Sequence, residues 1–285
     1  MSEENRALYV LKHHEIVPFI LKRESEGMKL NERGKISIED YNNNGKLWSG
    51  TKTIEEAFEK SIKGCKSCTD LVKGPIVHIL RKQNQWGIDY ALPNDVSGPI
   101  VDPGALSLGI PECCVLPEVH KKHTLGDEGI DIICNTVVSC VVGTEVIRAR
   151  GIVASTLAII AERMEIATRI IVGYTNDDTG SYYKGGNRND FAIILKDYSQ
   201  PLDIPLMAFY LVSPASSRRI GFSLFDSVDK DSSGRSHRLA ANTAYKSPRK
   251  TTIVIDHGHI RESMLEPEMA VEEALNILRR NGVIV

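Results

Sequence analysis

The apolar and polar positions between residues 130 and 175 follow the order of a strand, a helix and a second strand. Residues 130–142 read IDIICNTVVSCVV, which is too apolar on both faces for a strand with one face in water. Residues 145–163 have the apolar spacing of a helix, and RIIVGYT at 169–175 completes the unit. A strand, a crossover helix and a strand predict a parallel pair buried on both sides. We therefore expect a three-layer α/β fold with an open, mostly parallel sheet.

The same reading extends to the rest of the chain. Further strands are expected at 76–92, 191–198, 251–257 and 283–285, and helices at 7–24, 54–63, 203–212, 214–225 and 266–280. The polar stretches at 176–189 and 227–250 are expected to be long surface loops. Two parts follow: an irregular α+β portion at 1–125, packed on an α/β core at 126–285.

Composition narrows the function classes. Hydrophobic residues make up 42% and charged residues 25% of the 285, as in an ordinary soluble globular protein. The net charge of −2 gives no general basic field, so nucleic-acid binding lacks support from charge. No apolar run reaches the roughly 18 residues that span a bilayer, so we expect no membrane association. The acidic N-terminus is unlike a secretory signal, which predicts a cytoplasmic protein with reduced cysteines.

Four cysteines form a candidate metal set. Cys65 and Cys68 have the C-x-x-C spacing, and Cys113 and Cys114 follow, ahead of His120 and His123. Thiolates and imidazoles at such spacings can hold a tetrahedral Zn²⁺. Adjacent cysteines rarely bind one metal together, however, and a buried cysteine is often only a small apolar side chain. Both interpretations remain open.

A second candidate metal site lies in a Pro- and Gly-rich turn. Asp95, Ser97 and Asp102 bring two carboxylates and a hydroxyl into one short segment. Hard oxygen ligands of this kind suit a divalent cation such as Mg²⁺. The alternative is that these side chains bond to their own backbone in turns, which is the commoner role of Asp and Ser there.

Polar residues close to the expected strand ends form the rest of the candidate site. Asn135 interrupts the most apolar strand, where an unbonded amide would cost roughly 1–3 kcal/mol. Arg148 and Arg150 lie early in the following helix, where a positive charge opposes the helix dipole, so each should have a carboxylate or phosphate partner. Asp95 and Asp102 are candidates for that role. The alternative to a ligand clamp is a structural ion pair.

Two further positions extend this candidate set. Arg218 and Arg219 are adjacent in the helix expected after Pro214, and His257 follows Asp256 at the end of a strand. Histidine or aspartate at a strand end is where α/β enzymes place a general base. The sequence has no G-x-S-x-G, P-loop or G-x-G-x-x-G motif, which argues against a common nucleotide-binding enzyme or hydrolase.

Several segments resemble an uncharacterised protein family found mainly in bacteriophages and prophages. The segments are LWSGTKTIEEAFEKSIKG at 47–64, NDVSGPIVDPGALSLGIPECC at 94–114, RARGIVASTLAIIAERM at 148–164 and PLDIPLMAFYLVSPASSRRIGF at 201–222. The order of motifs is Trp-Ser-Gly, Asp-x-Ser-Gly with a later Asp, Arg-Gly, and Pro before a double Arg. The resemblance implies a phage-encoded protein and carries no assigned activity.

The strand–helix order is also similar to that of von Willebrand A-type and Rossmann-like domains. In A-type domains the first apolar strand ends in D-x-S-x-S, which coordinates a divalent ion. The matching strand here reads Asn135-Thr136-Val137-Val138-Ser139. Asn replaces the first Asp and Val replaces the first Ser, so the resemblance implies the topology with a degenerate metal site.

Two functions therefore stand as hypotheses. The first is a non-enzymatic, A-domain-like module that binds a phage or host protein in the bacterial cytoplasm. The second is an enzyme or ligand-binding protein for a phosphorylated or nucleic-acid substrate, with Mg²⁺ as a candidate cofactor. The second needs the following residues to converge above the sheet: Asp95, Ser97, Asp102, Asn135, Arg148, Arg150, Arg218, Arg219 and His257.

Overall fold

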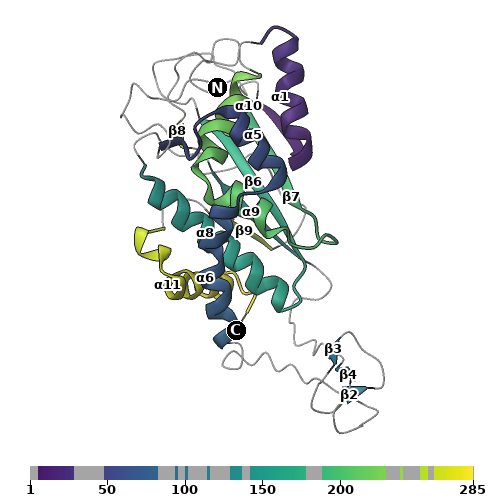
Figure 1. Cartoon of the computed structure of the whole chain (residues 1–285), viewed down its shortest axis with the longest axis vertical. Coiled ribbons are helices and arrows are strands. Elements are labelled where there is room, and N and C mark those ends of the chain that lie inside the picture. The colour runs from purple at the N-terminus through teal and green to yellow at the C-terminus, as the bar shows by residue number, and fades with distance from the viewer. Residues whose placement is uncertain are drawn as a thin grey trace.

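A computed structural model describes residues 6–28, 48–82, 94–95, 100–101, 114–115, 129–136, 142–177, 188–228, 238–239, 251–255 and 260–284. Structural statements below concern these residues. For residues 6, 80–82, 175–177, 188 and 238–239, and for 94–95, 100–101 and 114–115, only the backbone is described. Figure 1 shows the whole chain with its elements labelled.

The main sheet is mixed but mostly parallel. Its strands are ordered β1-β7-β6-β5-β9, and they span Arg6–Lys12 (β1), Ile130–Asn135 (β5), Thr168–Asp177 (β6), Arg188–Lys196 (β7) and Thr252–Ile255 (β9). Strand β5 is parallel to both β6 and β9, and β1 is parallel to β7, whereas β7 is antiparallel to β6. A two-residue strand, β8 (Arg238–Leu239), pairs with β6. The α/β fold class expected from the sequence is confirmed.

A second, small antiparallel sheet lies in the N-terminal half of the chain. Its strands are β2 (Asn94–Asp95), β4 (Cys114–Val115) and β3 (Ile100–Val101), in that order. The predicted division of the chain near residue 125 stays a prediction. Strand β1, from the N-terminal part, nevertheless supplies an edge of the main sheet.

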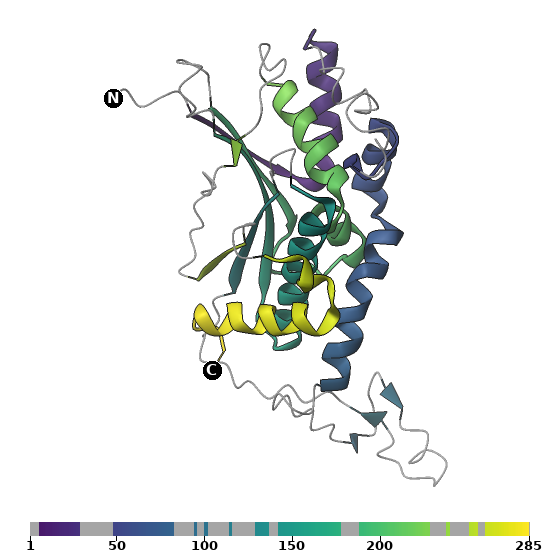
Figure 2. The ribbon, with the colours of Figure 1, turned by 90° about the vertical axis from the view of Figure 1, so that its left-hand side faces the viewer.

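The described helices gather on one side of the main sheet (Figure 2). They are η1 (His13–Glu15), α1 (Ile16–Ser25), α5 (Ile54–Lys63), α6 (Lys66–Lys82), α8 (Thr144–Arg163), α9 (Ile204–Val212), the π-helical η3 (Ser216–Gly221), α10 (Phe222–Asp226), η4 (Glu262–Leu265) and α11 (Pro267–Arg280). Helix α8 lies between the sheet and α6, which gives the order sheet, inner helix and outer helix (Figure 2).

Strand β5 is buried on both faces, as its sequence predicts. All six of its residues are buried. Ile132 belongs to the large core shared with the helices, while Ile133 joins Ile171 and Ala192 in a small cluster on the opposite face. The alternation of a strand's side chains explains how neighbouring residues enter two separate apolar clusters.

One ion pair is built into that opposite face. Asp131 is fully buried, and Arg169 donates from Nε to its Oδ1 at 3.0 Å and from Nη2 to its Oδ2 at 2.6 Å. The hydroxyl of Tyr198 donates to the same carboxylate. This bidentate pair with a third donor compensates the desolvation of a carboxylate inside the sheet.

Three predicted elements are wrong. Residues 7–12 form strand β1 instead of the start of a helix, because Tyr9 and Leu11 face the core while Leu8 and Val10 alternate outward. Residues 76–82 belong to helix α6 instead of a strand. Their β-branched residues favour a strand, but burial of Val72 and Ile79 at helical spacing prevails over that preference. Residues 283–284 form no strand.

Candidate functional site

The chain leaves β5 and enters α8 beside a buried arginine. Arg150 is 1% exposed, and its Nη2 donates to the main-chain oxygen of Thr136 at 3.2 Å. Thr136 in turn donates from both its N–H and its hydroxyl to the main-chain oxygen of Gly173 in β6. Asn135, just before it, is buried at the end of β5. Arg150 therefore helps to fix the carboxyl end of the central strand.

A buried tyrosine continues this polar layer. The hydroxyl of Tyr174 lies 2.7 Å from Oγ of Ser216, and both residues are buried. Burial raises the pKa of the Tyr174 phenol, against the opposing effect of hydrogen bonds with Ser216 and Thr136. The phenol thus stays neutral at physiological pH and links β6 to η3.

Arg218 joins two segments that are distant in the sequence. Its side chain is buried in η3, and its guanidinium lies over the ring of Trp48, 4.4 Å from the ring centroid. Nη1 donates to the main-chain oxygen of Trp48, and Nη2 donates to that of Val142. The arginine therefore fastens the segment before α5 to the segment before α8.

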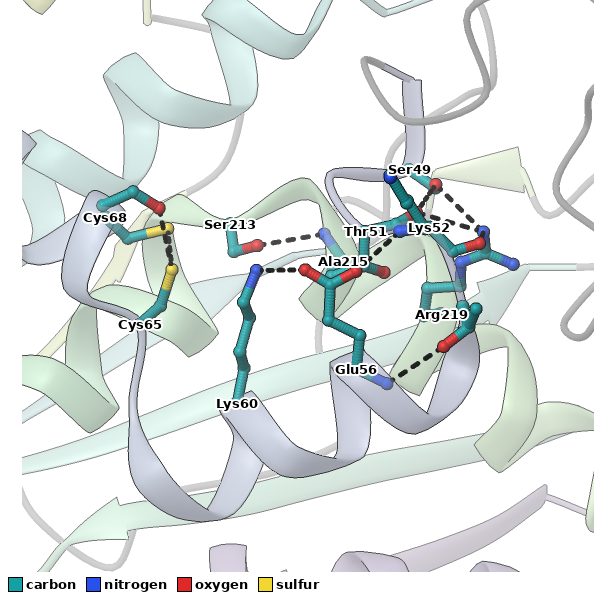
Figure 3. Close-up of polar contacts among 12 residues, drawn as sticks. Ser49, Thr51, Lys52, Glu56, Lys60, Cys65, Cys68, Ser213, Ala215 and Arg219 are labelled. Carbon is teal, nitrogen blue, oxygen red and sulfur yellow. Dashed lines mark hydrogen bonds and ion pairs between the residues drawn. The ribbon is translucent and has the colours of Figure 1, made fainter.

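Arg219 binds the next turn of the same N-terminal segment. Its Nη2 donates to Oγ of Ser49 at 3.2 Å and to the main-chain oxygens of Thr51 and Lys52 at 3.2 and 3.1 Å (Figure 3). Burial lowers the pKa of Arg219, and the carboxylates of Glu55 and Glu56 oppose that effect. Carbonyl acceptors of this kind partly replace the water that a buried guanidinium loses.

Two glycines allow the close approach that these contacts need. Gly50 has φ +75°, and a Cβ there would lie 3.1 Å from the backbone nitrogen of Ala215. A Cβ on Gly151 would lie only 2.1 Å from the main-chain oxygen of Leu211, where α8 crosses α9. We call the assembly of Arg150, Arg218 and Arg219 with residues 48–52 the arginine junction. The Trp-Ser-Gly motif thus packs on the segment of the double Arg, and the Arg-Gly motif packs on α9.

The other predicted site residues are not part of the arginine junction or have no described side chain. Arg148 is on the surface, with Nη1 3.5 Å from Oε1 of Glu145. Asp95 and Cys114 are paired across β2 and β4 by their backbones, and nothing is described of their side chains. The remaining predicted residues lie outside the described ranges: Ser97, Asp102, Cys113, His120, His123 and His257.

In the described part of the chain, the predicted metal ligands do not come together as a complete metal site. No group of three or more His, Cys, Asp or Glu side chains that could hold a metal ion occurs there. Cys65 and Cys68 do lie together, with their sulfurs 2.9 Å apart at the start of α6 (Figure 3). The zinc and magnesium hypotheses remain predictions.

A groove between α6 and α11 is a feature that the sequence did not indicate. It has a volume of about 490 Å³ and is lined by Lys73, Gly74, Val77, His78, Glu266, Pro267 and Glu268. The helices approach closely here, because a Cβ on Gly74 would lie 2.8 Å from Cγ of Pro267. The strands predicted at 76–92 replaced the second half of α6, which forms one side of the groove. The helical spacing of Val72, Ile76 and Ile79 is the signal that could have revealed it.

The lining of the groove has a mixed charge and includes one half-exposed apolar side chain. Val77 is 44% exposed. The ammonium of Lys73 lies 2.6 Å from Oδ1 of Asp70, which neutralises it. Nδ1 of His78 lies 3.7 Å from Oε1 of Glu268, whose side chain is 77% exposed. Acidic oxygens therefore dominate the α11 side of the groove.

Comparison with known families now places the chain. Residues 13–283 match the family model described as a domain of unknown function, DUF7192. The chain belongs to this family. The search of curated proteins and the search of solved structures gave no match.

Membership of this family agrees with the expectation of an uncharacterised family and assigns no activity. Among the described helices, none combines the length and the apolar character needed to cross a membrane.

Proposed function

We propose that this DUF7192 protein is a non-enzymatic interaction module that binds a protein segment in the groove between α6 and α11. The segment carries an apolar side chain beside a basic one. The resemblance to bacteriophage proteins makes a phage or host protein the expected partner. The arginine junction, in this proposal, supports the fold that presents the groove.

The observation that carries the proposal is how the three buried arginines are used. Arg150, Arg218 and Arg219 each donate to main-chain oxygens of the protein itself. A clamp for a phosphorylated substrate would instead direct these donors toward an open site. The three are at most 2% exposed, which keeps them from a ligand in solution.

The groove has features of a small protein-recognition site. Val77 offers an apolar surface to an inserted side chain, and Glu266 and Glu268 offer carboxylates to a neighbouring cation. Interfaces concentrate their binding energy at a few apolar contacts surrounded by a polar rim. The neutralised Lys73 leaves those carboxylates as the dominant charge for a partner to match.

A peptide-display selection on the full-length protein tests the proposal. We expect enrichment of sequences that place Leu, Ile or Phe next to Lys or Arg. A selected peptide should lose affinity for Val77→Asp and bind Glu268→Lys about tenfold more weakly, which is about 1.4 kcal/mol. The matched control is Ile62→Asp, because Ile62 is exposed on α5 and does not line the groove.

Two results would overturn the proposal. One is a selection without the apolar–basic pattern, or binding that Ile62→Asp weakens as much as Val77→Asp. The other is a thermal shift with Mg²⁺ and a nucleotide, of the size expected at 100 times the dissociation constant, about 2.7 kcal/mol. That shift would favour the alternative, an Mg²⁺-dependent protein for a phosphorylated or nucleic-acid substrate.

A further inference from the structure

A tight turn places one cysteine at the entrance of α6. Gly64 ends α5 with φ +81°, and a Cβ on it would lie 2.5 Å from Cβ of Pro205. The N–H of Cys65 then donates to the main-chain oxygen of Pro205 at 3.1 Å. The main-chain oxygen of Cys65 accepts from the N–H of Thr69, as a residue at a helix N-cap does. Cys65 is therefore held at the positive end of α6.

The second cysteine lies one turn further on the same face. Cys68 is three residues along, which puts its side chain next to that of Cys65. The two sulfurs are 2.9 Å apart, and both cysteines are free thiols. A disulfide has its sulfurs about 2.0 Å apart, so bond formation needs a closure of about 1 Å. Among the cysteines with a described side chain, the third, Cys134, is buried in β5.

The surroundings shift the pKa values of the two thiols in opposite directions. The hydrogen bond from Cys68 lowers the pKa of Cys65 to about 5, against burial, with help from the Ser67 hydroxyl, the N–H of Cys68 and the charge of Lys60. Donation to Cys65 and burial raise the pKa of Cys68. Lys60 is itself placed by an ion pair with Glu56, 2.7 Å from Nζ to Oε1 (Figure 3).

Two free sulfurs 2.9 Å apart at the positive end of a helix form the arrangement that a reactive dithiol requires. We propose that Cys65 and Cys68 are an oxidant-sensitive dithiol that hydrogen peroxide converts into an intramolecular disulfide. The oxidant must be small, because Cys65 is only 3% exposed. The site is independent of the groove between α6 and α11.

The chemistry balances in two steps. The Cys65 thiolate attacks one peroxide oxygen, the O–O bond breaks, and hydroxide leaves, so Cys65 becomes a sulfenic acid. The sulfur of Cys68 then attacks Sγ of Cys65, the S–O bond breaks, and the departing hydroxide takes the Cys68 proton as water. The hydroxide released in the first step becomes water with the proton that Cys65 lost on ionisation. In total two thiols and one peroxide give one disulfide and two waters. Both sulfurs are oxidised, and peroxide is reduced.

Peroxide treatment of the purified full-length protein, followed by mass spectrometry, tests this inference. We expect the intact mass to fall by two hydrogens and two thiols to be lost on titration after unfolding, both reversed by dithiothreitol. Trypsin cleaves after Lys63, Lys66 and Lys73. A bond between Cys65 and Cys68 therefore joins peptide 64–66 to peptide 67–73, which identifies it among the six cysteines.

Variants separate the two roles. Cys68→Ser should stop at a sulfenic acid on Cys65, which dimedone traps when the oxidised protein is unfolded in its presence. Cys65→Ser should form no such adduct on Cys68. Cys134→Ser is the matched control and should keep the linked peptides. The inference is overturned by linkage elsewhere, by an unchanged mass, or by sulfinic acid on Cys65 without linkage. The peptide map of the unmodified chain decides this even where a variant fails to fold.

Discussion

The crossing of α8 and α9 can be tested with a single methyl group. Gly151→Ala adds a Cβ that would lie 2.1 Å from the main-chain oxygen of Leu211 and 2.6 Å from Cα of Val212. These are backbone atoms, so no side-chain rotation can relieve the overlap. Helices α8 and α9 would have to move apart, together with the turn that carries the double arginine.

Two opposing effects determine how much Gly151→Ala changes the free energy of unfolding. On a free helix, replacing Gly by Ala stabilises by about 1 kcal/mol. In a packed core, an inserted carbon costs typically 1–3 kcal/mol, and more where the neighbours cannot move. Because the overlap here is with main chain at both atoms, we expect a net loss of about 2 kcal/mol or more in the free energy of unfolding.

Equilibrium unfolding in urea measures this loss directly, as a lower midpoint at an unchanged slope. Gly143→Ala is the matched control, since the nearest atom to its Cβ is a side-chain oxygen of Glu145 at 3.6 Å. As Gly143 is the N-cap of α8, its replacement should cost below about 1 kcal/mol. A Gly151→Ala protein as stable as the unmodified chain would refute the described crossing.

Three further predictions concern single contacts. Asp131→Asn removes a charge from the bidentate pair with Arg169 inside the sheet. It should lower the free energy of unfolding by about 3–5 kcal/mol, measured by unfolding in urea. A loss below about 1 kcal/mol would contradict the presence of this buried ion pair. Trp48→Leu removes the ring under Arg218 and should lower the free energy of unfolding by about 1–2 kcal/mol, seen as a lower melting temperature. An unchanged melting temperature would argue against the stacking of Arg218 on Trp48. The lowered pKa of Cys65, about 5, means that the thiolate forms above that pH. Its alkylation by iodoacetamide should therefore be near its plateau at pH 7 and fall as the pH drops through 5; a rate that rises tenfold from pH about 7 to 8, as for an ordinary thiol, would contradict this.

The central part of the fold could be predicted because its signal is local. Strand β5 is mostly apolar and buried along its length, and α8 has a buried surface so wide that residues 149–161 are buried throughout. Strand β1 could not be predicted in this way. Its pairing partner β7 lies far away in the sequence, and a short run with apolar residues at 8, 10 and 11 fits both periods.

The candidate site was predictable in its residue types but not in its partners. A pair of adjacent arginines in an apolar segment signals that something binds them, and Arg218 and Arg219 are indeed buried and bonded. Their acceptors are mainly main-chain oxygens, which every residue carries, so no sequence pattern marks them. The groove depends on the meeting of α6 and α11, which no local pattern describes.

In the proposal above, the buried arginines hold the fold together and bind no ligand. The most direct measurement compares the free energies of unfolding of Arg219→Leu and Arg148→Leu in urea. Losing Arg219 leaves the Ser49 hydroxyl and the main-chain oxygens of Thr51 and Lys52 without their shared donor. At about 1–3 kcal/mol for each buried acceptor left unpaired, the loss should be roughly 3–5 kcal/mol. Losing the half-exposed Arg148 should change stability by less than about 1 kcal/mol. Equal stability of the two variants, with Arg219→Leu folded like the unmodified protein, would contradict the account.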